Sequence, residues 1–132
     1  MVGGPQIRID PTSDVPAVRQ IMDGLRVLLV EGELAPGAEL PSVRRLAMEL
    51  GIHFNTVAEA YRQLAAEGWL DLKHGRGAIV VERVMPPTPD RDWTDDFRNR
   101  LRGMVAHMRS EGISAEGIAA ELRAMAEVVK QS

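Results

Sequence analysis

Residues 40–80 read LPSVRRLAMELGIHFNTVAEAYRQLAAEGWLDLKHGRGAIV, and this stretch decides the fold. Apolar residues recur in it at the helical spacing i, i+3, i+4 in two runs. The first run, residues 43–50, follows a serine that can cap a helix, and the second run ends at Gly68. Because only residues 51–53 separate the runs and include a glycine, the two helices are predicted to form a helix-turn-helix.

The end of the same stretch predicts a β-hairpin. Two short apolar runs, residues 69–72 and 78–81, flank the sequence KHGRG at 73–77, which combines basic residues with glycines that allow a tight turn. Upstream, apolar residues at helical spacing predict a first helix at about 16–31. Three helices followed by a hairpin make a winged helix-turn-helix.

The chain divides by composition into three parts. The winged helix-turn-helix is expected at 9–84, and a proline-rich linker at 85–92 follows it. Residues 93–131 show two further amphipathic helices, interrupted at 112–114. The predicted fold class is therefore mainly α with a small β-hairpin, ending in a two-helix dimerisation segment.

The last two helices are too short to enclose a metabolite pocket. Their apolar faces need a cover, and a second copy of the chain would supply it. We therefore expect a homodimer with two-fold symmetry, whose DNA-binding helices lie about one DNA turn apart. Whether a small-molecule effector exists stays open. The residues expected at the dimer interface are Trp93, Phe97, Leu101, Met104, Met108, Ile118, Leu122 and Met125.

Composition limits the function classes. The chain has 132 residues, a net charge of −3 and no cysteine, so disulfides and thiolate metal sites are excluded and a reducing cytoplasm is expected. No apolar run is long enough to span a membrane, and no secretory signal is visible. The acidic balance gives no general support for nucleic-acid binding, so such binding has to rest on where the charges lie.

No pattern indicates an enzyme or a cofactor site. The three histidines lack the spacing of metal ligands. Gly75 and Gly77 are not followed by a helix or by a Lys-Ser/Thr pair, as a nucleotide-phosphate loop would require. Ser42 has no histidine base nearby in the pattern, and helix capping explains it. We expect no catalysis, no metal and no cofactor.

The third helix has one polar side. Projection at 100° per residue places Asn55, Glu59 and Arg62 opposite the apolar residues Val57 and Leu64. Asparagine can pair with adenine, arginine with guanine, and glutamate with the cytosine amino group. The face is thus predicted to read bases, although a solvated helix face would show the same residues.

Several motifs at matching separations resemble the DNA-binding domain of the GntR family of bacterial regulators. These are LPSVRRLA at 40–47, NTVAEAYRQL at 55–64, Gly68, and Gly75-x-Gly77. The resemblance is close over about 9–83. The last 40 residues are similar to the family's YtrA-like short branch only in length and helix count.

The resemblance implies roles for individual residues. It implies DNA contacts by Arg44 from the start of the second helix, by Asn55 and Thr56 at the head of the third, and by Gly75 in the minor groove. The chain departs from the family at Phe54 and Ala58, where many members of other branches carry arginine, and at Glu59, which is acidic. The operator sequence is therefore not transferable. The full set of predicted DNA-binding residues is Arg44, Arg45, Asn55, Thr56, Glu59, Arg62, Lys73, His74, Gly75 and Arg76.

The predicted function is a sequence-specific regulator of transcription that binds double-stranded DNA as a homodimer and represses by occluding a promoter. The alternative is a winged-helix protein-interaction module without DNA binding, which the acidic net charge and Glu59 favour. For Arg44 and Arg45 the alternative role is to solubilise the second helix.

Overall fold

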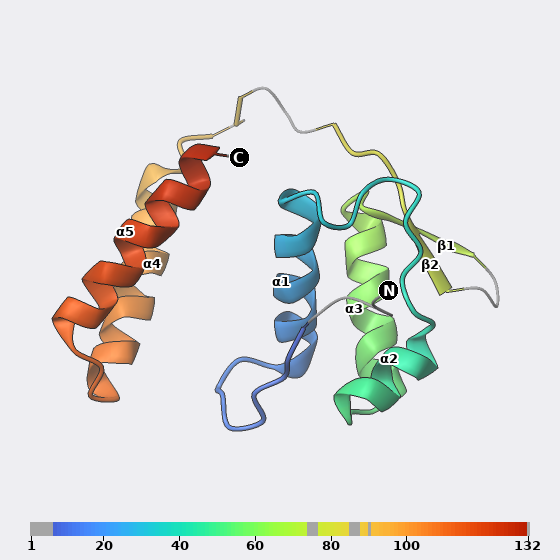
Figure 1. The fold of residues 1–132 in the computed structure, drawn as a ribbon, viewed down its shortest axis with the longest axis horizontal. Coiled ribbons are helices and arrows are strands. Elements are labelled where there is room, and N and C mark those ends of the chain that lie inside the picture. Colours follow the sequence, from blue (N-terminus) through green and yellow to red (C-terminus); the bar gives the residue numbers. More distant parts are fainter. Residues whose placement is uncertain (1–6, 74–76, 85–87, 90, 132) are drawn as a thin grey trace. The chain divides into compact units, whose positions relative to one another are not determined.

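The computed structural model describes residues 7–73, 77–84, 88–89 and 91–131. The chain forms two compact units, Met1–Val84 and Met85–Ser132 (Figure 1).

The first unit contains three helices and a two-stranded antiparallel sheet. In chain order these are α1 (Ala17–Val30), α2 (Val43–Leu50), α3 (Phe54–Ala66), β1 (Leu70–Lys73) and β2 (Gly77–Val80). The predicted order of three helices and a hairpin is confirmed, with each boundary within one or two residues of its expected place.

Local chemistry explains the helix-turn-helix. The Ser42 hydroxyl accepts a hydrogen bond of 3.2 Å from the backbone N–H of Arg45, which caps α2. Gly51 ends α2 with φ +70°, a left-handed conformation that glycine adopts without steric cost. The α3 helix then begins at Phe54, so the predicted three-residue turn is confirmed.

The core of this unit lies where the three helices and the hairpin meet. The α3 helix packs against α1, α2 and β1, and thus occupies the centre of the unit (Figure 1). A core of this kind gains its stability from apolar area removed from water. The buried core residues are Ile21, Met22, Leu25, Leu29, Leu40, Leu46, Ala47, Val57, Ala60, Tyr61, Leu64, Trp69, Leu70, Ala78 and Val80.

The hairpin is tied to the segment that precedes α2. Strand β1 pairs with β2 from Leu70–Val80 to Lys73–Gly77. On its other edge β2 meets residues 37–40, where the Leu40 N–H donates to Ala78 O and the Val80 N–H donates to Ala38 O, each at 2.8 Å. This second set of hydrogen bonds fixes the hairpin relative to the start of α2.

The second unit is a helical hairpin of α4 (Thr94–Ser110) and α5 (Ala115–Gln131). Asp95 and Asp96 lie in the first turn of α4, where the helix dipole favours negative charge. Neither helix contains a buried residue in the chain as the structure describes it. Residues of both helices line an apolar groove of about 450 Å³, among them Leu101, Met104 and Leu122. Within this unit, taken by itself, the groove is therefore open to solvent.

Candidate nucleic-acid interface

The α3 helix has the two faces that its sequence predicts. Val57 and Leu64 are fully buried, whereas Asn55 and Arg62 are exposed. Glu59 lies at the edge of the exposed face and is half-buried. The orientation of α3 is thus set by burial of one face, which leaves the polar face available to a partner.

Tyr61 joins α3 to the start of α2. Its ring is buried, and its hydroxyl donates a hydrogen bond of 2.7 Å to the carbonyl oxygen of Pro41. Burial raises the pKa of Tyr61 above its ordinary value of 10, and the negative charge of Glu49 adds to the rise. Tyr61 is therefore part of the core.

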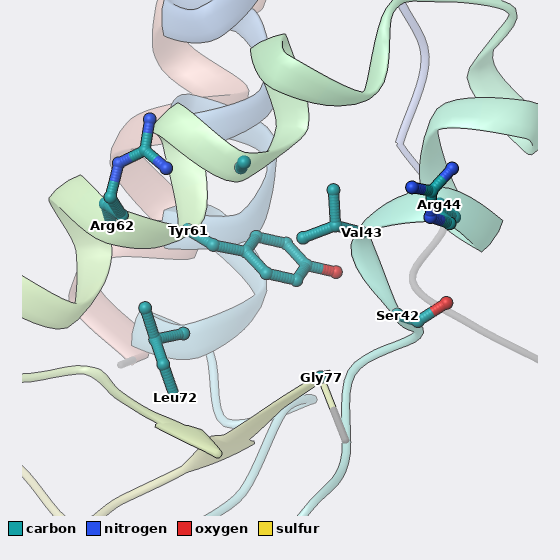
Figure 2. A pocket seen from close by; sticks show the side chains of 8 residues that line it. Ser42, Val43, Arg44, Tyr61, Arg62, Leu72 and Gly77 are labelled. Carbon is teal, nitrogen blue, oxygen red and sulfur yellow. The ribbon is translucent and has the colours of Figure 1, made fainter. Parts of the chain in front are cut away.

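A cleft of about 430 Å³ opens between α2, α3 and the hairpin. Figure 2 shows the Tyr61 ring in this cleft, with Arg62 on one side of it and Val43 and Arg44 on the other. Leu72 and Gly77 of the hairpin complete the wall. The cleft thus brings together arginines from both helices of the helix-turn-helix.

Arg62 has a carboxylate partner on its own helix. Its Nη2 atom lies 2.8 Å from Oε1 of Glu59, and the Gln63 amide donates to Oε2 of the same carboxylate at 2.9 Å. The hydrogen bonds from Arg62 and then Gln63 lower the pKa of Glu59. The carboxylate therefore stays ionised at neutral pH and can only accept hydrogen bonds.

Arg44 is held differently, by an aromatic ring. Its guanidinium carbon lies 4.9 Å from the centroid of the Phe54 ring, within the range of a cation–π contact. The Phe54 ring in turn stacks on His53, with 4.7 Å between centroids and 23° between planes. Among the described residues, none forms an ion pair with Arg44.

The other predicted DNA contacts in the two helices have local partners. The Arg45 Nε atom lies 3.0 Å from Oε1 of Glu49, one turn further along α2. Thr56 is half-buried, and its backbone N–H donates to the carbonyl oxygen of His53 at 3.1 Å. Arg45 lies in the first turn of α2 and Thr56 in the first turn of α3.

The predicted contacts at the hairpin tip lie outside the described residues. These are His74, Gly75 and Arg76, together with the side chain of Lys73, whose backbone closes β1. Their DNA-binding role stays a prediction from the sequence.

Two residues of this surface escaped prediction from the sequence. His53 caps α3, because its Nδ1 atom accepts a hydrogen bond of 3.0 Å from the backbone N–H of Asn55. Phe54 supports Arg44 although the sequence marks it only as a departure from the family pattern. His53 directly precedes the first turn of the predicted helix, and that position was the available signal.

The described residues contain no cluster of three or more histidine, aspartate or glutamate side chains that could hold a metal ion. No helix in the described ranges is both long and apolar enough to cross a membrane.

Comparison with known proteins identifies the family. Residues 17–80 match the model of the bacterial regulatory proteins of the gntR family. The chain is 32% identical over 110 residues to the HTH-type transcriptional repressor YtrA of Bacillus subtilis, an alignment that covers 83% of this chain and 84% of that protein. The chain belongs to the GntR family.

Solved structures agree with this GntR-family assignment. A YtrA protein from Sulfolobus acidocaldarius, described as a GntR-family transcription factor, aligns with a TM-score of 0.55 and 34% identity over 94% of this chain and 99% of that one. A transcriptional antiterminator from Listeria monocytogenes aligns with a TM-score of 0.66 and 21% identity, covering 94% of this chain and 92% of that one, which supports the fold alone.

Membership of the GntR family assigns the class of function. The chain is a DNA-binding transcriptional regulator with a winged-helix fold, in agreement with the prediction from its motifs. Its similarity to YtrA over most of the chain places it with the short YtrA-like members.

Proposed function

We propose that this GntR-family regulator is a homodimeric repressor that binds a two-fold operator. Two copies would place two α3 helices in successive major grooves on one side of the duplex, about one DNA turn apart. Bound DNA would then be closed to other proteins that need the same promoter. The repressor role is carried over from B. subtilis YtrA, which is named a transcriptional repressor.

The proposed DNA contact rests on the arrangement of Arg44, Asn55 and Arg62. Arg44 and Arg62 line one cleft from two different helices, and Asn55 is exposed in the first turn of α3. In a helix-turn-helix the first turn of the second helix enters the major groove deepest. In this proposal Asn55 pairs with an adenine edge, and Arg44 contacts DNA from the start of α2.

Arg62 and Glu59 act together in this proposal. Glu59 offsets the charge of Arg62, so Arg62 contributes less to non-specific attraction than an unpaired arginine would. The Glu59 carboxylate can accept a hydrogen bond from a cytosine amino group. Lys73, His74, Gly75 and Arg76 of the hairpin, with Arg45 and Thr56, would contact phosphates or the minor groove.

The dimer would form through α4 and α5. Trp93, Phe97, Met104 and Met125 are each at least half exposed in the single chain. Such a concentration of exposed apolar surface on two helices is characteristic of an interface. A second copy can cover it symmetrically, since a two-fold interface uses the same surface on both subunits.

The test is selection of duplexes from a random library by the purified protein, followed by affinity measurements on the enriched duplex and on random DNA. Asn55→Ala should weaken binding to the enriched duplex by about 1–3 kcal/mol and binding to random DNA much less. Arg62→Ala should weaken both more evenly. The α3 cap uses only the backbone N–H of Asn55, which alanine retains, so Asn55→Ala should melt at the wild-type temperature.

Two outcomes would contradict the proposal. Equal weakening of both duplexes by Asn55→Ala would remove Asn55 from base recognition. Failure of the wild-type protein to enrich any sequence would favour the alternative, a winged-helix module that binds protein.

A further inference from the structure

Phe54 is an exposed aromatic residue with no part in the core. The residue is 40% exposed, and it belongs neither to the buried cluster nor to the partly buried residues that pack against that cluster. The exposed part of its apolar surface contributes nothing to folding. Its two ring contacts are Arg44, near the start of α2, and His53, the last residue of the turn before α3.

The contacts of Phe54 form a short chain from the backbone to Arg44. The His53 imidazole is fixed because its Nδ1 accepts the hydrogen bond that caps α3. The Phe54 ring stacks on that imidazole, and the Arg44 guanidinium lies over the Phe54 ring. The Phe54 ring thus favours one direction for an otherwise flexible arginine that has no ion-pair partner among the described residues.

Phe54 is the first residue of α3 and directly precedes Asn55, and it is partly exposed. In the major groove the apolar group that distinguishes one base pair from the others is the 5-methyl group of thymine. An exposed phenyl ring at the head of the recognition helix matches that group in chemistry, whereas a phosphate or a base amide would lose hydration against it.

From these observations, and resting on the proposed function, we propose that Phe54 and Arg44 act as one recognition unit. Phe54 positions the Arg44 guanidinium and contacts a thymine 5-methyl group beside the base or phosphate that Arg44 binds. Phe54 is then a specificity-determining residue of this chain, at a position where its sequence departs from the arginine of other branches.

The positioning role is tested by a double-mutant cycle on the duplex enriched from the random library. Phe54→Leu keeps apolar bulk but removes the aromatic face, and should weaken binding about two- to fivefold in the wild-type background. In the Arg44→Ala background the same change should have no effect. Phe54→Tyr keeps the ring face and should bind like the wild type. Equal effects of Phe54→Leu in both backgrounds would overturn the positioning role.

The methyl contact is tested by replacing single thymines of the enriched duplex with deoxyuridine, which removes only the methyl group. At one position per half-site this replacement should weaken binding by the wild type about three- to fourfold. Phe54→Ala should bind the duplexes with thymine and with deoxyuridine at that position equally well. Equal losses for the wild type and Phe54→Ala at every thymine would overturn the contact.

These experiments distinguish failure of the Phe54–Arg44 recognition unit from failure of the proposed operator binding. Enrichment of a specific duplex combined with additive effects of Phe54 and Arg44 would refute the recognition unit and leave the regulator intact. Failure to enrich any duplex would refute both. Melting temperatures of the Phe54 variants should stay near that of the wild type, because the ring lies outside the core.

Discussion

At the scale of single residues, Tyr61 shows how one polar group serves the fold beneath the DNA-binding surface. Its buried ring fills the space between α3 and the start of α2, and its hydroxyl satisfies the Pro41 carbonyl. Buried polar groups are costly unless they are hydrogen-bonded, so this single bond makes the tyrosine tolerable in the core.

Tyr61→Phe should lower the free energy of unfolding by about 1 kcal/mol at neutral pH, because the Pro41 carbonyl loses its partner. The wild-type protein should also lose stability in alkali. Burial raises the pKa of Tyr61 in the folded state, so its contribution is complete below pH 10 and falls as the unfolded chain ionises above that pH. Urea unfolding at a series of pH values measures both effects.

The substitution Tyr61→Phe removes this ionisation. Above pH 10 the slope of the free energy of unfolding against pH should therefore differ between the two proteins by the equivalent of up to one proton. Tyr61 is the only tyrosine in the chain, and the absorbance of tyrosinate therefore reports its ionisation directly. Parallel stability curves above pH 10 would show that the folded state does not hold the phenol neutral.

The same scale shows what sequence patterns miss. Burial of Val57 and Leu64 and exposure of Asn55 and Arg62 follow from helical periodicity, and the structure has them so. The Arg44–Phe54 contact and the capping of α3 by His53 depend on the rotamers of the side chains that make them. Periodicity carries no information about such contacts.

At the scale of elements, turn chemistry predicted the helices and the hairpin well. Ser42 and Gly51 mark both ends of α2, because capping and left-handed backbone have strong residue preferences. The pairing of residues 37–40 with β2 was not predicted. That segment shows no alternating pattern, and its partner strand lies about forty residues further along the chain, a separation that local sequence signals do not reach.

Gly77 depends on this unpredicted pairing. It has φ +79°, and an added Cβ atom would lie 3.3 Å from the Leu40 carbonyl oxygen and 3.4 Å from the Ser42 Cα atom. Gly77→Ala should therefore cost more than the roughly 1–2 kcal/mol of a left-handed alanine, since the hairpin also has to move away from the start of α2. Chemical unfolding measures the cost.

Gly51→Ala is the matched control for Gly77→Ala. Gly51 has φ +70°, and an added Cβ atom would meet nothing within 4 Å, so alanine there should cost the backbone strain alone. The difference between the two variants isolates the contact between the hairpin and the segment before α2. Equal costs would mean that the hairpin adjusts freely.

At the scale of the whole molecule, the two units differ in how far their apolar side chains are buried. Every buried core residue that the structure describes lies between Ile21 and Val80, in the first unit. The second unit has an apolar groove and, within the described residues, no buried side chain. The first unit therefore contains a core of its own, whereas α4 and α5 leave their apolar groove uncovered within their own unit. Sequence periodicity predicted the apolar faces of both helices, but a pattern within one chain does not specify which surface covers them.

Truncation after Pro89 should give a folded monomer that binds the operator much more weakly than the full chain. Two linked DNA-binding units gain about 10²–10⁴ in affinity when both half-sites engage together, and a monomer loses this gain. Light scattering measures the oligomeric state, and titration of a duplex with one half-site against a duplex with two measures the avidity. An unchanged dimer after truncation would place the interface in the first unit.

A pair of single substitutions tests the same interface in the full chain. Met104 lines the groove and is 64% exposed, whereas Arg102 on the same helix is exposed and does not line it. Met104→Glu buries a charge in the proposed interface, so it should give a monomer whose affinity for a single half-site is unchanged. Arg102→Glu introduces the same glutamate outside the groove and should remain dimeric. Circular dichroism confirms that α4 keeps its helix in both variants. If Met104→Glu stayed dimeric, the groove would not be the surface through which two copies of this regulator meet.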